Sequence, residues 1–234
     1  CLAGYTDGHN NVYDFLIQLW SRGGVLFDED WKPVFDGEIG CESLQYLADL
    51  FTRHKVVSPE CLGMGSVECG NYYATGQAAM MWNWCGFAAV CEMPEYSQIV
   101  GRNICTTMPS VSLNIYWVLC LASRSQNKDL AYEFMQFVTS PAMDKVTSMK
   151  GANGTRLSTW RDPEVQAKYP HYVIIEQAHA KTRTLPAIPE FPELNELLSA
   201  GIHQVMHQGR PAAEALNDAA RACEGVLRRT GRLA

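Results

Sequence analysis

Amphipathic helical patterns bounded by proline and glycine are the feature of this sequence that most restricts its fold. In residues 193–208 apolar side chains recur every three or four positions, with Pro192 at the start and Gly209 just beyond the end. Proline suits the first turn of a helix, and glycine readily adopts the left-handed backbone that ends one. Similar patterns predict helices at residues 11–21, 41–54, 127–138 and 142–149, and a last helix after Pro211. Ser140-Pro141 and Asp162-Pro163 each predict a capping side chain followed by a proline in the first helical turn.

Short apolar runs between these helices predict a sheet. Residues 78–82 (AAMMW) are apolar on both faces of an extended chain, so we expect a strand buried between layers of helices. Alternating helices and strands are typical of an α/β protein. We expect the acidic turn at 28–30 and the glycine-rich loop at 63–70 to lie at the surface. Further strands are predicted at residues 25–31, 104–108 and 116–122.

The charge balance argues against a protein that binds nucleic acid or an anionic membrane surface. The 19 Lys and Arg are outnumbered by 25 Asp and Glu, which gives a formal net charge of -6, and the basic residues are scattered. No apolar run approaches the roughly 18–20 residues that span a bilayer. Hydrophobic residues form 47% of the chain, which is enough for a sizeable core and excludes a disordered chain.

The nine cysteines do not follow a metal-binding or redox motif. None forms Cys-x-x-Cys, which disfavours zinc ribbons and thioredoxin-like sites. Cys61 and Cys69 flank the glycine-rich loop and are a candidate disulfide, whereas the remaining cysteine usage favours a reducing compartment. The chain begins at Cys1 without Met, so we expect a fragment or a processed product, on which this cysteine could carry a lipid.

Two patterns leave room for other chemistry. Cys85 follows a predicted strand, so a cysteine-dependent hydrolase with His171 or His179 as its base is the alternative function. His203 and His207 stand four residues apart and could face one metal ion, but without the Glu of a His-Glu-x-x-His motif a solvated helix face is favoured. We therefore expect no metal and no cofactor.

Aromatic side chains gather at the ends of predicted elements. Trp84 and Phe87 follow the strand at 78–82, and Tyr116 and Trp117 open the strand at 116–122. Aromatic faces can stack against the apolar faces of sugars in a binding cleft. The competing interpretation places these rings in the core. The candidate hydrogen-bonding partners for such a ligand are Asn83, Asn114 and Arg156.

The order of several segments resembles one known family. Residues 13–24 (YDFLIQLWSRGG) resemble the Leu-Trp-x-x-Gly-Gly region of the family 1 extracellular solute-binding proteins of ABC importers, the maltose-binding-protein-like group. Residues 73–84 (YATGQAAMMWNW) resemble its Phe-x-x-Gly-x-Ala-Ala-Met strand and aromatic loop. Each segment alone is weakly specific, but their shared order covers almost the whole chain. The other matching segments are residues 117–128, 131–141 and 151–163.

This resemblance implies an α/β, helix-rich, type II periplasmic-binding-protein-like fold. Such proteins have two lobes joined by a hinge, and this chain would hold mainly one lobe and a returning segment of the other. Residues 1–111 would form part of lobe II, residues 112–148 would return to lobe I, and residues 149–234 would form the C-terminal helical part of lobe II. With the main body of lobe I absent, residues 112–148 should expose an apolar surface that favours self-association.

The resemblance also implies a function without chemistry. The protein would be the substrate-binding component of an ABC importer, periplasmic or extracytoplasmic, that captures a sugar or polyol between its lobes and delivers it to the permease. In two places the chain departs from the family: Ile115 and Tyr116 replace glycines, and Gly154 replaces a proline. The ligand-binding residues implied by position are Trp84, Phe87, Tyr116, Trp117, Asn83, Asn153 and Arg156.

Overall fold

The computed structural model describes residues 8–233, which excludes Cys1 and the expectation attached to it. The chain divides into two compact units, each built from separate stretches of sequence. The first unit contains residues up to Tyr73, Gln77–Asn83 and the chain from Thr184 onward. The second contains Ala74–Gly76 and Trp84–Arg183.

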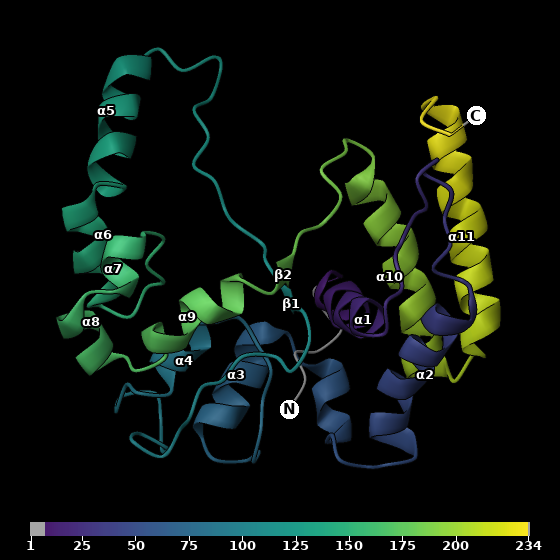
Figure 1. Ribbon diagram of the computed structural model, residues 1–234, viewed down its shortest axis with the longest axis horizontal. Helices are drawn as coiled ribbons and strands as arrows, with labels where there is room; N and C mark the ends of the chain where they lie inside the picture. The colour runs from purple at the N-terminus through teal and green to yellow at the C-terminus, as the bar shows by residue number, and fades with distance from the viewer. Residues whose placement is uncertain (1–7, 234) are drawn as a thin grey trace. The chain divides into compact units, whose positions relative to one another are not determined.

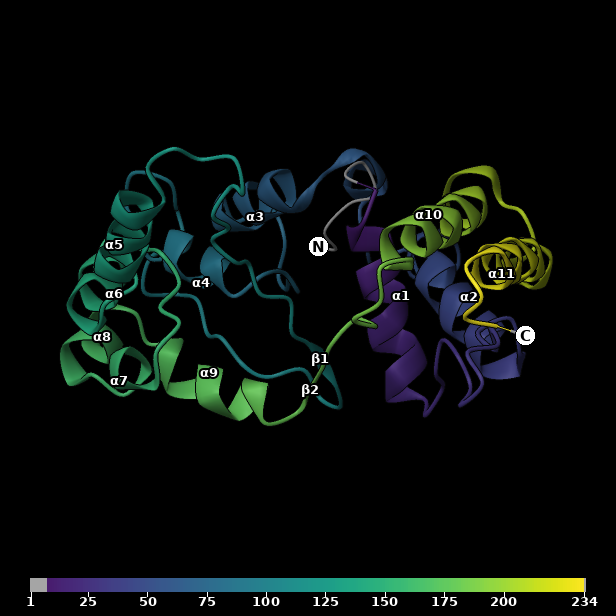
Figure 2. The same cartoon turned by 90° about the horizontal axis from the view of Figure 1, so that it is seen from above.

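The first unit is helical. Its long helices pack against one another, and α10 and α11 run side by side (Figures 1 and 2). The predicted helix ends are confirmed at Gly209, which has a φ of 69° and ends α10 in the left-handed conformation. The elements are α1 (Asn10–Ser21), α2 (Glu38–Thr52), η1 (Pro59–Gly63), most of α3 (Ser66–Ala74), α10 (Phe191–Gln208) and α11 (Ala212–Arg229).

The core of this unit is formed by the apolar stripes that the helical periodicity predicts. Phe15 and Leu16 of α1, Leu44 of α2, Ile202 of α10 and Leu216 of α11 are all completely buried. One polar pair crosses this core, where Ser199 Oγ donates to Asn11 Oδ1 at 3.0 Å and Asn11 Nδ2 donates to the Ser199 carbonyl at 3.1 Å. Burial of apolar area therefore stabilises the unit.

Removing one methyl group from this core should have a measurable cost. Ile202→Val should lower the free energy of unfolding by about 1 kcal/mol, because Ile202 is fully buried and the neighbours relax only partly into the space. Chemical denaturation measures the change. Val56→Ala, at a largely exposed position, is the control and should have little effect. Equal losses in the two variants would contradict this packing.

The second unit consists of short helices and one small sheet. Strand β1 (Ser112–Leu113) pairs in parallel with β2 (Thr182–Arg183), with Ser112 opposite Thr182 and Leu113 opposite Arg183. The helices α6 to α9 lie together in Figure 1. The helices of this unit are α4 (Gly86–Val90), α5 (Lys128–Val138), α6 (Pro141–Ser148), α7 (Leu157–Trp160), α8 (Pro163–Lys168) and α9 (Tyr172–His179).

Side-chain caps begin two of these helices as the sequence predicts. Ser140 Oγ accepts the backbone N–H of Met143 at the start of α6, and Asp162 accepts those of Glu164 and Val165 at the start of α8. In each case proline follows the cap and fits the first helical position. Local sequence therefore sets these helix starts.

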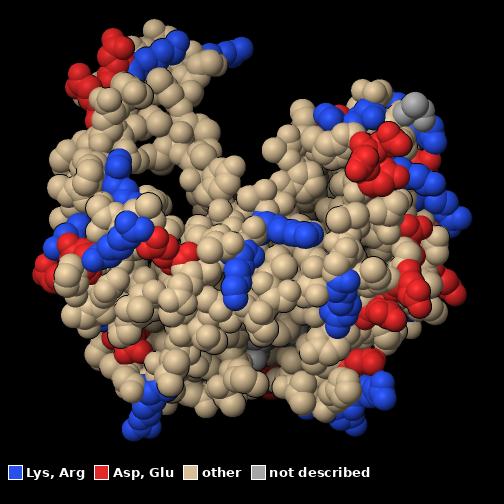
Figure 3. Space-filling model, viewed as in Figure 1, with Lys and Arg blue, Asp and Glu red and all other residues tan. Residues whose placement is uncertain are grey.

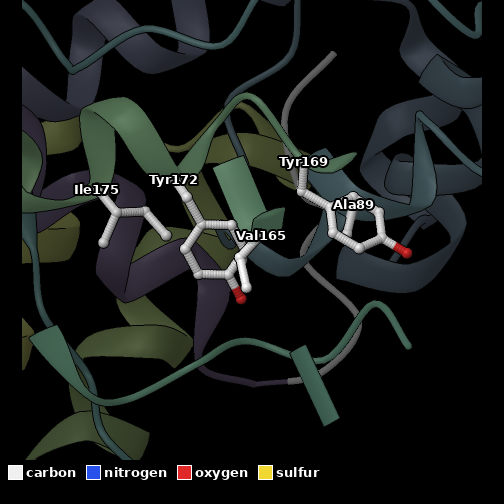
Figure 4. Packing of buried hydrophobic residues seen from close by; sticks show 5 residues of the cluster. All are labelled: Ala89, Val165, Tyr169, Tyr172 and Ile175. Carbon is white, nitrogen blue, oxygen red and sulfur yellow. The ribbon is translucent and has the colours of Figure 1, made fainter. Parts of the chain in front are cut away.

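A small apolar cluster holds the helices of the second unit together. Figure 4 shows Ile175 at one end of the cluster and Tyr169 with Ala89 at the other. Tyr172 of α9 and Val165 of α8 complete it and are almost fully buried. Met93, Met149 and Trp160 pack against the cluster from its margin.

The predicted sheet is wrong in most of its strands. Residues 78–82 form no strand apart from a bridge residue at Trp82, and Met80 is 79% exposed. Residues 104–108 and 116–122 are irregular. A strand needs a hydrogen-bonding partner from elsewhere in the chain, and in residues 8–233 only β1 and β2 form a named sheet.

The expectations for the loops have mixed outcomes. The acidic turn Asp28–Asp30 is exposed, and the preceding segment forms only an isolated antiparallel bridge between Phe27 and Pro33. The loop expected at 63–70 is wrong in its second half, because Ser66 begins α3 and Cys69 is buried. The Cys61–Cys69 disulfide is also wrong: Cys61 carries a thiol, whereas Cys69 is disulfide-bonded.

An exposed apolar surface lies on α5 and on the segment before it, as expected for residues 112–148. No residue of α5 is buried, although its apolar stripe is strongly one-sided. We call this surface the α5 apolar face. It comprises Tyr116, Trp117, Val118, Leu119, Leu130, Phe134 and Phe137.

The charged surface is mixed in sign. Figure 3 shows Lys and Arg side chains interspersed with Asp and Glu on the face that it draws. Around α11, Asp218 pairs with both Arg210 and Arg221, and Arg228 pairs with Glu224. None of the helices within residues 8–233 is long and apolar enough to cross a membrane.

Candidate functional site

The aromatic loop and the loop that carries Asn153 meet in the second unit. The aromatic loop turns back at its start, where the Phe87 N–H donates to the Trp84 carbonyl at 3.0 Å. The Trp84 and Phe87 rings are half-buried. Asn153 lies against this turn: a Cβ on Gly86 would lie 3.1 Å from Asn153 Nδ2. Two segments that are almost seventy residues apart therefore meet where Asn153 lies against the turn that carries Trp84 and Phe87.

A buried carboxylate holds the second of these loops in place. Asp144 of α6 accepts from the backbone N–H and the hydroxyl of Thr155 at 3.0 and 3.1 Å, and from the Arg156 N–H at 3.3 Å. Thr159 Oγ1 donates at 2.5 Å to Asp144 Oδ2, the same oxygen that accepts from Arg156. Hydrogen bonds to a charged acceptor in a buried site are among the stronger ones, so Asp144 determines the path of residues 152–156.

Two aromatic side chains hold the same loop from its other side. The Tyr172 hydroxyl accepts the Gly154 N–H at 2.7 Å and donates to the Ala152 carbonyl at 2.9 Å. Trp160 Nε1 donates to the Gly154 carbonyl at 2.6 Å. A Cβ at Gly154 would lie 2.7 Å from Ser148 Oγ, so this close approach requires glycine. Proline, which the resemblance would place here, also lacks the N–H that Gly154 donates to Tyr172.

Arg156 makes contacts within the protein. Its Nε and Nη2 atoms donate to the Thr139 carbonyl at 2.8 and 2.5 Å, just after the end of α5. Guanidinium groups stabilise the unsatisfied carbonyls at helix ends. This bonding links the loop to α5, and a direct hydrogen bond from Arg156 to a ligand stays a prediction.

The remaining predicted site residues lie in other surroundings. Tyr116 and Trp117 are 70% and 93% exposed and belong to the α5 apolar face. Asn83 belongs to the first unit, where its Nδ2 donates to the Ser66 carbonyl at 2.8 Å. The backbone of Asn114 extends the β1–β2 pairing through its N–H to the Arg183 carbonyl. Their roles in binding stay predictions.

Cys85 lacks the surroundings of a catalytic nucleophile. Desolvation raises the pKa of its thiol, and the hydrogen bond with Asn153 opposes this more weakly. Both ring nitrogens of His171 lack a hydrogen-bond partner, and the His179 ring lies 4.8 Å from that of Trp160. A cysteine hydrolase needs a thiolate paired with a base, so the geometry does not support this alternative.

The histidine pair on α10 is a stacked pair. The His203 and His207 rings are 4.1 Å apart and nearly parallel. Across residues 8–233, no group of three or more His, Cys, Asp or Glu side chains is arranged to hold a metal ion. Both side chains are exposed, as expected for a solvated helix face.

Sequence reasoning missed Asp144 and Tyr172. Asp144 is part of a correctly predicted helix, but its partners begin eleven residues later, and nothing local marks it as buried. The hydroxyl-rich run from Thr155 to Thr159 is the one signal that could have suggested a buried acceptor nearby. Tyr172 carries no comparable signal.

Comparison with known proteins identifies the family. The family described as Bacterial extracellular solute-binding protein matches residues 1–145, which is more than half of the chain. The chain belongs to this family. Among curated solute-binding relatives, a probable amino-acid ABC transporter periplasmic-binding protein of Sinorhizobium fredii is 24% identical over 227 residues, with 97% of this chain and 52% of the relative covered. The chain thus spans about half the length of that solute-binding protein.

Solved solute-binding structures share the fold. Maltose-bound MalE3 of T. maritima superimposes with a TM-score of 0.87 at 24% identity, covering 92% of this chain and 57% of that one. A solute-binding protein of Agrobacterium radiobacter K84 in complex with ribitol gives 0.86 at 23% identity, covering 96% and 59%. These likenesses confirm the predicted periplasmic-binding-protein-like fold class for this member of the family.

Proposed function

We propose that this chain is part of the substrate-binding component of an ABC importer, and that it captures a sugar or polyol for delivery to the permease. The observation that carries the proposal is the contact between the Trp84–Phe87 turn and Asn153. Two half-buried rings can cover the apolar face of a sugar, while an amide can both donate to and accept from its hydroxyls. Family membership supports the transport role.

The lobe assignment is part of the same proposal. Residues 1–111 and 149–234 are assigned to lobe II, and residues 112–148 to lobe I. The α5 apolar face supports this assignment, because large apolar patches on a folded protein commonly mark an interface. In a protein with a complete lobe I, this face would pack against the rest of that lobe. In the chain by itself, it would favour self-association.

A neutral ligand is proposed over an amino acid. The matched Sinorhizobium fredii relative is named as an amino-acid binder, whereas the MalE3 and Agrobacterium structures contain maltose and ribitol. An amino acid would need a cation for its carboxylate, and Arg156 donates instead to the Thr139 carbonyl. The stacking rings and the Asn153 amide suit hydroxyl groups.

The proposal places the protein in the periplasm or otherwise outside the cytoplasm. Membership of an extracellular solute-binding family supports this location. The disulfide at Cys69 also supports it, because disulfides persist in oxidising compartments. Anchoring through a lipid on the full-length protein is the membrane-attached form of the same proposal.

Truncating the central ring of the site should weaken ligand binding. Trp84→Ala should reduce the affinity for the best sugar or polyol roughly tenfold to a hundredfold, because it removes a half-buried stacking surface. Calorimetric titration of the protein from its complete reading frame, against a panel of sugars, polyols and amino acids, measures the change. Trp117→Ala in the same titration tests the prediction that the Trp117 ring also contacts the ligand.

The exposed Tyr96, in the same unit, provides the matched control. Tyr96→Ala should keep the wild-type affinity, and circular dichroism should show that all variants are folded. If Trp84→Ala binds as tightly as the wild type, the aromatic turn is not the site. If only amino acids bind to the wild type, the proposed ligand class is wrong.

A further inference from the structure

A polar cavity in the second unit lies beside the end of α4. It has a volume of about 160 Å³ and is lined by α4 and the residues that follow it, by an extended segment, and by the start of α9. None of the ligand-binding residues discussed above lines it. Its lining residues are Ala88, Glu92, Asn103, Ile104, Cys105, Pro170 and His171.

The histidine in this wall is buried without hydrogen-bonding partners. His171 is only 5% exposed, and neither Nδ1 nor Nε2 has a partner within the protein. Its ring lies near those of Tyr172 and Tyr169, with centroids 4.6 and 6.1 Å away. Buried polar atoms are nearly always hydrogen-bonded, so an orphaned imidazole beside a cavity points to an occupant of that cavity.

The charge and chemistry of the walls restrict this occupant. Burial keeps His171 neutral, so one ring nitrogen donates and the other accepts. Glu92 contributes a carboxylate, one oxygen of which accepts the Gly101 N–H at 3.0 Å, and this charge disfavours an anion. Ala88, Ile104 and Pro170 add apolar surface. A ligand needs hydroxyl groups, which both donate and accept, on a small carbon skeleton.

The volume sets the size of the ligand. An apolar cavity of about 150 Å³ holds a molecule of about six non-hydrogen atoms, such as benzene. We propose that this cavity is a binding site for a small uncharged polyol of about six non-hydrogen atoms, hydrogen-bonded to His171. The site is independent of the proposed transport cleft, since it shares no residue with the Trp84–Phe87 turn or with Asn153.

Glycerol, with six non-hydrogen atoms, is the probe. In protein labelled with ¹⁵N-histidine, titration with glycerol should shift the His171 ring-nitrogen resonances along a saturable curve with a midpoint in the millimolar range. Acetate, which is anionic and smaller, should leave them unchanged. Linear shifts without saturation would show that water alone fills the cavity and would overturn the proposal.

Two variants test the location. His171→Phe is unsuitable, because it removes the reporter and could disturb the core. Ala88→Leu is used instead, because it fills the cavity from α4 and leaves the imidazole in place. The His171 resonances of Ala88→Leu should no longer respond to glycerol. His179→Phe, at the far end of α9 and outside the cavity, should leave the His171 response unchanged.

The primary site provides an independent readout. Ala88→Leu should keep the wild-type affinity for the best sugar or polyol of the panel, and Trp84→Ala should keep the glycerol response of His171. An unchanged glycerol response in Ala88→Leu would overturn the cavity proposal. A panel without any sugar or polyol ligand would overturn only the transport proposal.

Discussion

Asp144→Ala should lower the free energy of unfolding of the second unit by about 3 kcal/mol. The substitution removes a buried acceptor and leaves the N–H groups of Thr155 and Arg156 and the hydroxyl of Thr159 without it. Hydrogen bonds to a charged group contribute about 1.5–3 kcal/mol each, and orphaned donors add a desolvation cost, while partial relaxation and entry of water offset part of the loss. The loop of residues 152–156 should become mobile.

Urea denaturation monitored through the NMR resonance of the Trp160 indole N–H measures this loss, because that group donates to the same loop. Ligand affinity should fall too, since Asn153 is carried by that loop. Asp144→Asn keeps one oxygen acceptor and should lose less stability than Asp144→Ala. Asp129→Ala, on the exposed first turn of α5, is the control. If Asp144→Ala and Asp129→Ala are equally stable, Asp144 does not hold the loop.

Acidification from pH 7 to pH 4 should cost the second unit up to about 3 kcal/mol through His171 alone. Burial lowers the pKa of this imidazole from 6.5 to about 4 in the folded protein. Between these values the unfolded chain binds a proton that the folded chain does not, so stability falls as the pH drops below 6.5. Each unit of pKa difference corresponds to about 1.4 kcal/mol, which gives this size of effect.

Stability measured in urea at several values between pH 7 and pH 4 tests the expectation. His171→Phe keeps an aromatic ring between Tyr169 and Tyr172 but cannot take up a proton, so its stability should depend less on pH. His179→Phe provides the comparison, since it removes a histidine whose ring lies 4.8 Å from that of Trp160. An acid dependence in His171→Phe as steep as in the wild type would show that other groups cause it.

Helices were predictable because their causes are local. Caps, first-turn prolines and terminal glycines act within four or five residues, and the structure confirms them at Ser140, Asp162 and Gly209. The apolar stripes of α1, α10 and α11 became the core of the first unit for the same reason. The stripe of α5 is just as clear in the sequence, yet it is exposed, because periodicity shows which face is apolar and not what covers it.

Strands depended on partners that lie far away in the chain. The runs at 78–82, 104–108 and 116–122 have the composition of strands, but an extended segment becomes part of a sheet only when another segment pairs with it. The one pairing between named strands in residues 8–233 joins Ser112–Leu113 to Thr182–Arg183, about seventy residues apart. Composition contains no information about such a pairing.

The candidate site shows the same division. The sequence by itself placed Trp84 and Phe87 on one turn, and family resemblance added Asn153. Only the tertiary structure brought Asn153 against Gly86, placed Asp144 under its loop and buried His171 beside a cavity. The sequence determined which residues form helices and which faces are apolar, because those are short-range properties. The tertiary structure decided burial, orphaned polar groups and the meeting of loops, because these depend on packing between distant segments.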